Sequence, residues 1–138
     1  MSMNPLERKK LVANWLTLQQ IRKRSSDRQD LSWVVAKIWD LCDDAPNEAF
    51  EFILGVLEED ASSAGMAILS AGPLEALLRK HGPRIIGRVE RRARRDPKFV
   101  QLLGHVWKNT MSSTIWMRVE SARNRANDLA ARQAERSR

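Results

Sequence analysis

Arginines recur one helical turn apart between residues 84 and 95, and their side chains could bind phosphate or carboxylate groups. On a helix that turns about 100° per residue they project from one side. A guanidinium group binds either anion through two parallel hydrogen bonds. We call this set the arginine ridge: Arg84, Arg88, Arg91, Arg92 and Arg95.

Charge is strongly segregated around this ridge. The segment from Arg79 to Lys98 holds nine Lys or Arg and only two carboxylates. The segment from Asp40 to Asp60 holds eight carboxylates and no Lys or Arg. The ridge therefore either meets an anionic partner or is a solvated face that pairs in part with these acids. The end of the acidic segment forms a second pole: Glu58, Glu59 and Asp60.

The net charge of +7 favours acidic partners. We expect an acidic protein as the partner of the ridge, and nucleic acid is the alternative. Nucleic-acid binding would be favoured by aromatic side chains that stack bases beside the ridge. The chain has no Tyr, and we expect the nearby Phe99 and Trp107 to face the core. No known nucleic-acid-binding motif is present either.

Residues that could support catalysis are few. His81 and His105 have no carboxylate or nucleophile placed beside them in sequence. Cys42 lies on an apolar helical face, where a thiol is buried and inert. The acidic stretch around Asp44 lacks the spacing of a calcium loop, and no phosphate-binding loop occurs. We therefore expect no enzyme activity, metal or cofactor; a small enzyme whose site is assembled from distant residues is a further alternative.

Tryptophan is frequent, with five residues in the chain. Trp side chains anchor protein interfaces as well as cores. Trp15 and Trp107 lie on apolar arcs, which predicts that both are buried. Trp33 shares its side of a helix with Lys37 and Asp40. Either another helix covers Trp33 or it is an anchor for a binding partner.

The elements that must position these residues are helical, because apolar residues recur with a period near 3.6 and nowhere alternate. We predict an all-α fold, a compact bundle or array of about seven to eight mostly short antiparallel helices. It forms a single domain over residues 1–138, ordered over about 4–130, with a frayed basic tail. The predicted helices are 4–21, 31–42, 46–59, 62–70, 73–81, 83–95, 97–108 and 113–135.

Proline and glycine set the predicted helix boundaries. Pro73, Pro83 and Pro97 suit the first turn of a helix, where a missing N–H removes no hydrogen bond. Gly72 and Asp96 precede two of these prolines, and Asn4 precedes Pro5, so these three residues could cap the helices that follow. Gly82 could end one helix as the next begins. The helix over 46–59 has so wide an apolar arc that it should lie at the centre of the fold.

The last helix carries a heptad-like apolar seam. Packing of this seam within the chain is the expectation, and a homodimer through 113–135 is the less favoured alternative. The seam consists of Ile115, Val119, Ala122, Ala126 and Leu129.

The location is expected to be cytoplasmic. No stretch of 18 apolar residues could span a membrane, so we expect no membrane association. The first ten residues lack the apolar segment of a signal peptide. The single cysteine excludes a disulfide within the chain.

Two stretches resemble known proteins: AGPLEALLRKHG at Ala71–Gly82, and RVERRARRDPKFVQLLGHVWKNTMSSTIWMRV at Arg88–Val119. They are similar to a family of small bacterial helical proteins described only as a domain of unknown function. The resemblance implies a bacterial or phage origin and an all-helical domain, and it implies no activity, cofactor or site residue. Together with the segregated charge, it favours a protein-binding adaptor or inhibitor, of the type that neutralises a toxin or blocks a defence system.

Overall fold

The all-α prediction is confirmed by the computed structural model, which describes residues 3–24, 32–109 and 111–136 and the side chains of 3–20, 33–109 and 111–124. These residues contain helices and no strand. A five-residue π-helical turn, η1, joins two of the helices. The elements are α1 (Pro5–Arg24), α2 (Ser32–Asp44), α3 (Pro46–Glu59), α4 (Ser63–Leu69), η1 (Ser70–Leu74), α5 (Glu75–Arg95), α6 (Pro97–Leu103) and α7 (Ser113–Arg136).

Side-chain caps start the helices where the sequence predicts them. Asn4 Oδ1 accepts a hydrogen bond from the Glu7 amide at 2.8 Å, and Asn4 Nδ2 donates one to the Glu7 carboxylate. Asp96 Oδ1 accepts a hydrogen bond from the Lys98 amide at the start of α6. These bonds satisfy amides that have no partner within the first helical turn. The predicted roles of Asn4 and Asp96 are therefore confirmed.

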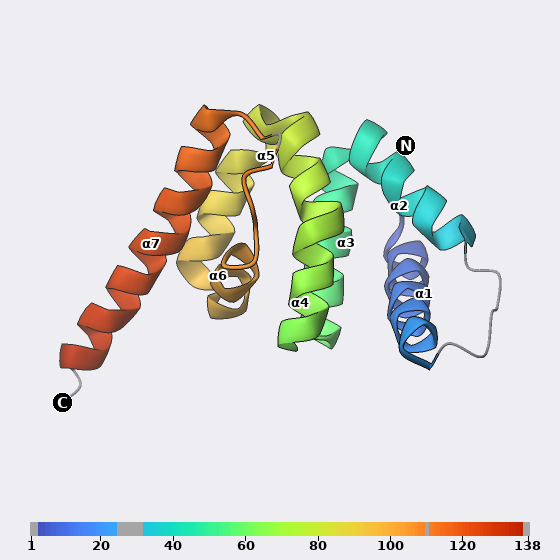
Figure 1. Cartoon of the computed structure of the whole chain (residues 1–138), viewed down its shortest axis with the longest axis horizontal. Helices are drawn as coiled ribbons and strands as arrows, with labels where there is room; N and C mark the ends of the chain where they lie inside the picture. Colours follow the sequence, from blue (N-terminus) through green and yellow to red (C-terminus); the bar gives the residue numbers. More distant parts are fainter. Residues whose placement is uncertain (1–2, 25–31, 110, 137–138) are drawn as a thin grey trace.

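The helices lie side by side in a row (Figure 1). α1 and α2 form one end, α3 and α4 the middle, and α7 the opposite end, from which its C-terminal part extends away. Direct packing joins α1 to α3, α3 to α5, and α5 and α6 to α7.

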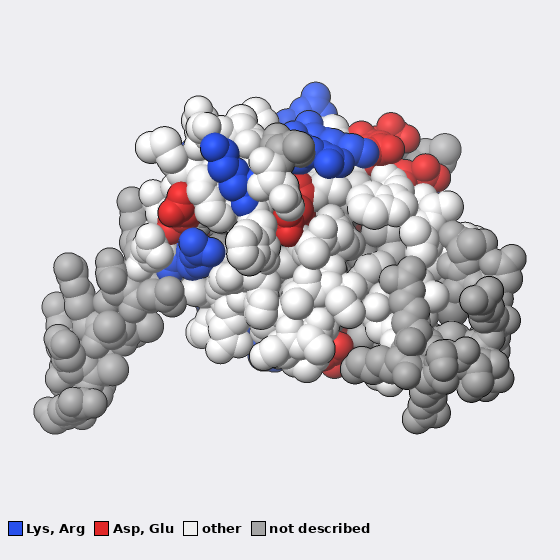
Figure 2. Space-filling model, viewed as in Figure 1, with Lys and Arg blue, Asp and Glu red and all other residues white. Residues whose placement is uncertain are grey.

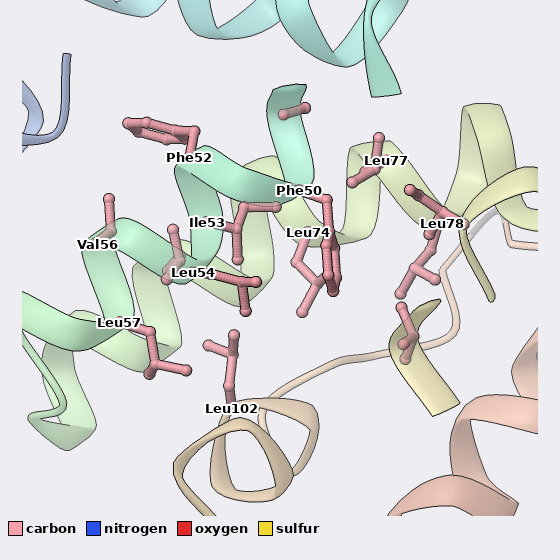
Figure 3. Close-up of a cluster of buried hydrophobic side chains, with 14 of the residues drawn as sticks. Phe50, Phe52, Ile53, Leu54, Val56, Leu57, Leu74, Leu77, Leu78 and Leu102 are labelled. Carbon is pink, nitrogen blue, oxygen red and sulfur yellow. The ribbon is translucent and has the colours of Figure 1, made fainter. Parts of the chain in front are cut away.

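The core is centred on α3, as its wide apolar arc predicts. Phe50, Ile53 and Leu57 are each at most 2% exposed. Figure 3 shows apolar side chains of α3 facing those of η1, α5 and α6, among them Leu74 and Leu102. Phe50 also meets Phe99 of α6 edge to face, with ring centroids 5.7 Å apart. Burial on all these sides explains why α3 tolerates polar residues only on a narrow face.

Helix α1 covers another side of α3. Trp15 is buried and meets Phe52 edge to face, with ring centroids 6.0 Å apart. Gly55 allows this approach, because a Cβ at that position would lie 3.0 Å from Cγ2 of Val12. The prediction that Trp15 belongs to the core is confirmed.

The predicted helix start at Pro73 is wrong. Pro73 lies within η1, and the chain runs from α4 through this wider turn into α5. A π-helical turn leaves room for a proline that would otherwise crowd the preceding turn. Gly72 is part of the same turn and does not cap a new helix.

The predicted break at Gly82 and Pro83 is a kink inside α5. His81 has non-helical angles (φ −129°, ψ 28°), directly before the two residues. Proline in a helix interior removes one hydrogen bond and crowds the carbonyl four residues earlier, which explains the bend. His81 Nε2 also lies 2.8 Å from the carbonyl oxygen of Asp43, to which it donates as the Nε2–H tautomer. This contact and the Lys80–Asp43 ion pair tie the kink to the end of α2.

Gly82 follows the kink at His81, close to the predicted helix boundary, and it also lets α7 approach α5. Gly82 is buried, and a Cβ there would lie 2.7 Å from Cγ1 of Ile115. Ile115 and Val119 of the predicted seam are buried, and α5 and α7 are in direct contact. The first half of the seam thus packs within the chain, whereas the side chains of Ala126 and Leu129 lie outside the described residues.

Helix α6 ends at Leu103, five residues earlier than predicted. The described residues between α6 and α7, 104–109 and 111–112, are not helical, and Val106 and Met111 are buried there. The prediction that Trp107 is buried is wrong, since its side chain is 72% exposed. The prediction assumed that α6 continues past Trp107, but α6 ends at Leu103.

Candidate functional site

The arginine ridge lies on α5 after the kink, and the structure divides it into paired and unpaired members. Arg88 Nη2 lies 2.5 Å from Glu51 Oε1 on α3, and its guanidinium stacks 4.7 Å from the centroid of the Phe50 ring. Arg92 Nη2 lies 2.9 Å from Asp96 Oδ2, four residues further along the chain. These two arginines therefore stabilise the fold.

The other ridge members are turned to solvent. Arg84, Arg91 and Arg95 are exposed, and none has a hydrogen bond or ion pair with the described part of the chain. The pairing with acids of α3 applies to Arg88. Binding of an external anion by the exposed arginines stays a prediction.

The acidic pole is divided in a similar way. Asp60 Oδ1 accepts a hydrogen bond from the Ser62 amide at 3.0 Å, so Asp60 links the end of α3 to the start of α4. Glu58 and Glu59 are exposed and line a groove of about 470 Å³ between α1 and α3. Arg8 and Lys9 line the same groove. Opposite charges therefore face one another there, and the pole is not a continuous acidic surface.

Several tryptophans lie at the surface, in contrast to the buried Trp15. Trp33, the predicted anchor, is 51% exposed on α2. Trp39 is 40% exposed further along the same helix, and Trp107 is more exposed than either. Trp116 is half-buried, with the Arg123 guanidinium 5.7 Å from its ring centroid. Sequence reasoning named Trp33 but missed Trp39 and Trp107 as surface residues.

A face without charge extends along α4. No Asp, Glu, Lys or Arg occurs from residue 61 to residue 74. Figure 2 shows the side over α4 as largely uncharged, with Lys and Arg gathered above it and Asp and Glu over α2. We call its exposed residues the α4 face: Ala64, Ala67, Ile68 and Ala71. The missing charges in 61–74 are the signal that could have revealed this face from sequence.

A small pocket of about 100 Å³ adjoins the α4 face. Glu75 lines it and is only 7% exposed. Asn109 Nδ2 donates a hydrogen bond to Glu75 Oε1 at 2.5 Å, and the backbone of Trp107 bonds the same carboxylate. Burial raises the pKa of Glu75, and these hydrogen bonds oppose the rise. The remaining lining is Trp39, Ala71, Gly72, Ala76, Arg79, Lys108, Asn109 and Met111.

The residues considered for catalysis are not brought together. His81 bonds the backbone of α2, and His105 is half-buried in the connection after α6. Cys42 is buried, burial raises its thiol pKa to about 11, and its Sγ lies 3.7 Å from the carbonyl oxygen of Pro73. Among the described residues no three His, Cys, Asp or Glu side chains could jointly hold a metal. A helix with the length and hydropathy of a membrane span is also absent from those residues.

Comparisons with known proteins give one match. A family of unknown function (DUF6869) matches residues 21–127, which include α2 to α6 and exclude most of α1. No curated protein and no solved structure matches the chain.

Proposed function

The chain belongs to DUF6869, a family of unknown function, and we propose from its surface that it is a non-enzymatic protein that binds an acidic protein through the exposed members of the arginine ridge. One observation carries this proposal. Arg84, Arg91 and Arg95 present guanidinium groups to solvent from one helix and have no carboxylate partner in the described part of the chain.

Arginine is suited to this role. Its planar group pairs with carboxylates through two hydrogen bonds and is less strongly hydrated than an ammonium group. Arg88 and Arg92 are held by Glu51 and Asp96, so the helix that carries the exposed arginines is tied to the fold. A partner therefore meets a helix whose backbone is already fixed, and the ordering cost of binding falls on the exposed arginine side chains. An adaptor or inhibitor is the role that we propose for such a surface.

Affinity purification from the native host tests the proposal. Wild-type protein should capture a partner with an acidic surface, and Arg84→Glu/Arg91→Glu should reduce the captured amount at least tenfold. Lys10→Glu/Lys37→Glu is the matched control, because it makes the same change of charge at exposed positions on α1 and α2. The control should retain the partner. Equal loss in both variants would mean that net charge, and not the ridge, attracts the partner.

The same experiment separates protein from nucleic acid. Half of each sample is treated with nuclease before capture, and binding to the purified partner is then measured as salt is raised. Nucleic-acid affinity falls steeply with salt because each neutralised phosphate releases a counterion. A protein interface depends on salt mainly through its association rate. Nuclease-sensitive capture with a steep salt dependence would overturn the proposal in favour of nucleic acid.

A further inference from the structure

Trp39 lines the pocket that adjoins the α4 face, and Trp107 directly precedes Lys108, another residue of that lining. The α4 face and this pocket form a second surface, separate from the ridge. We propose that this surface docks an acidic segment of a partner protein, with an apolar side chain in the pocket beside Trp39 and carboxylates on Arg79 and Lys108. This inference goes beyond the proposed function, because none of these residues belongs to the ridge.

The apolar part of the proposal follows from exposure. Trp107 and Trp39 are 72% and 40% exposed, and Ile68 is 38% exposed on the α4 face. Tryptophan is enriched among the residues that contribute most to protein–protein binding energy, and charged residues are depleted at interface centres. The pocket of about 100 Å³ is of the size of one side chain. A protein segment with one apolar anchor therefore fits it better than a cofactor.

The acidic part follows from charge complementarity. Arg79 and Lys108 line the pocket and are exposed, and neither has a carboxylate partner within the described residues. Glu75 lines the same pocket, but its carboxylate is buried and bonded by Asn109 and by the backbone of Trp107. A carboxylate beside the anchor would therefore meet two available cations. A second copy of this chain, with its net charge of +7, would be repelled overall.

The Glu75–Asn109 hydrogen bond makes Glu75 a positioning residue for this surface. Asn109 has a positive φ of 42°, a left-handed conformation that asparagine tolerates better than most residues. The bond holds this turn against α5, next to Lys108 and Trp107. A loop that is already fixed when the partner arrives costs less entropy on binding.

Selection from a phage-displayed library of random peptides tests the inference on the full-length protein. Wild-type protein should enrich peptides that combine acidic residues with a large apolar residue. The synthetic peptides should bind at least tenfold more weakly to Trp39→Ala and to Arg79→Glu, because both residues line the pocket. Arg79→Glu/Lys108→Glu, used as a separate target, should enrich basic peptides with the same apolar residue.

Two control variants make the result specific. Trp33→Ala removes an exposed indole away from the pocket, and Arg84→Glu/Arg91→Glu removes ridge charge; both should bind the peptides as wild type does. Failure of the ridge proposal would therefore leave this result unchanged. The inference is overturned by enrichment without acidic residues, by unchanged binding to Trp39→Ala or by an absence of enriched peptides. A concentration-dependent dimer that Trp39→Ala abolishes would also overturn it.

Discussion

Glu75 and Asn109 are 34 residues apart in sequence, yet Asn109 Nδ2 and Glu75 Oε1 are 2.5 Å apart. The bond joins the first turn of α5 to the connection between α6 and α7. The same carboxylate bonds the backbone of Trp107. One buried acid thus supports the part of the connection that carries this exposed tryptophan.

Glu75→Gln should become more stable relative to wild type as pH rises. Burial raises the folded-state pKa of Glu75, so wild type has its full stability below the ordinary glutamate pKa and loses part of it as pH rises through the folded value. The glutamine side chain of the variant does not titrate and can still accept a hydrogen bond from Asn109. Urea unfolding of both proteins at about pH 4 and pH 7 measures the difference.

Asn109→Asp is the counterpart of this change. It places a second carboxylate against Glu75, and like charges at this distance disfavour ionisation of both groups. We expect this variant to lose more stability at neutral than at acidic pH. A free energy of unfolding with the same pH profile as wild type would contradict the burial of Glu75.

Gly82→Ala should destabilise the protein by about 1–3 kcal/mol, the usual cost of overpacking a core. The new methyl group would lie 2.7 Å from Cγ1 of Ile115, whose branched side chain has few other rotamers. Gly87→Ala is the matched control on the same helix, where a Cβ would meet only the end of the Arg91 side chain at 3.4 Å. The control should gain about 0.5–1 kcal/mol from helix propensity. Equal effects of the two changes on thermal unfolding would refute close α5–α7 packing.

Arg88→Ala should reduce stability by about 1–2 kcal/mol, because it removes a partly exposed ion pair with Glu51 and the contact with the Phe50 ring. Arg84→Ala should change stability by less than about 0.5 kcal/mol, as for other exposed sites. Chemical denaturation of the two variants distinguishes structural from available arginines. A similar loss in both would mean that Arg84 also has a structural role.

Cys42 should resist thiol reagents in the folded protein. Its side chain is fully buried, and burial raises its pKa to about 11, so almost no thiolate exists at neutral pH. Modification by a disulfide reagent such as DTNB should proceed at the rate at which the core opens, and rapidly in urea. Fast modification of the native protein would contradict the packing of α2 against η1.

Local sequence signals predict most of the fold. The caps at Asn4 and Asp96 and the apolar arc of α3 act through residues within a few positions of each other, and all appear as predicted. The predicted helix start at Pro73 is wrong, because the chain forms a π-helical turn there, whereas the boundary predicted at Gly82 and Pro83 appears as a kink. The reason that position 82 is glycine lies in a distant element. Only the approach of Ile115 shows why position 82 must be glycine.

The candidate surfaces are less predictable for the same reason. A helical wheel places the ridge on one side of α5, but it cannot show that Glu51 of α3 reaches Arg88. The exposure of Trp107 follows from the end of α6 at Leu103, which the apolar pattern does not mark. The pocket beside Trp39 needs α2, α5 and the connection after α6 together, and no single stretch of sequence indicates it.

The edge-to-face contact of Trp15 with Phe52 crosses the border at which the family match begins, residue 21. The matched residues are therefore a shorter length of chain than the packed core, which includes α1. A fragment trimmed to the matched residues would carry a bare phenylalanine ring on α3. Such a fragment would need a detergent, a neighbouring protein or a replacement helix to keep that ring from water.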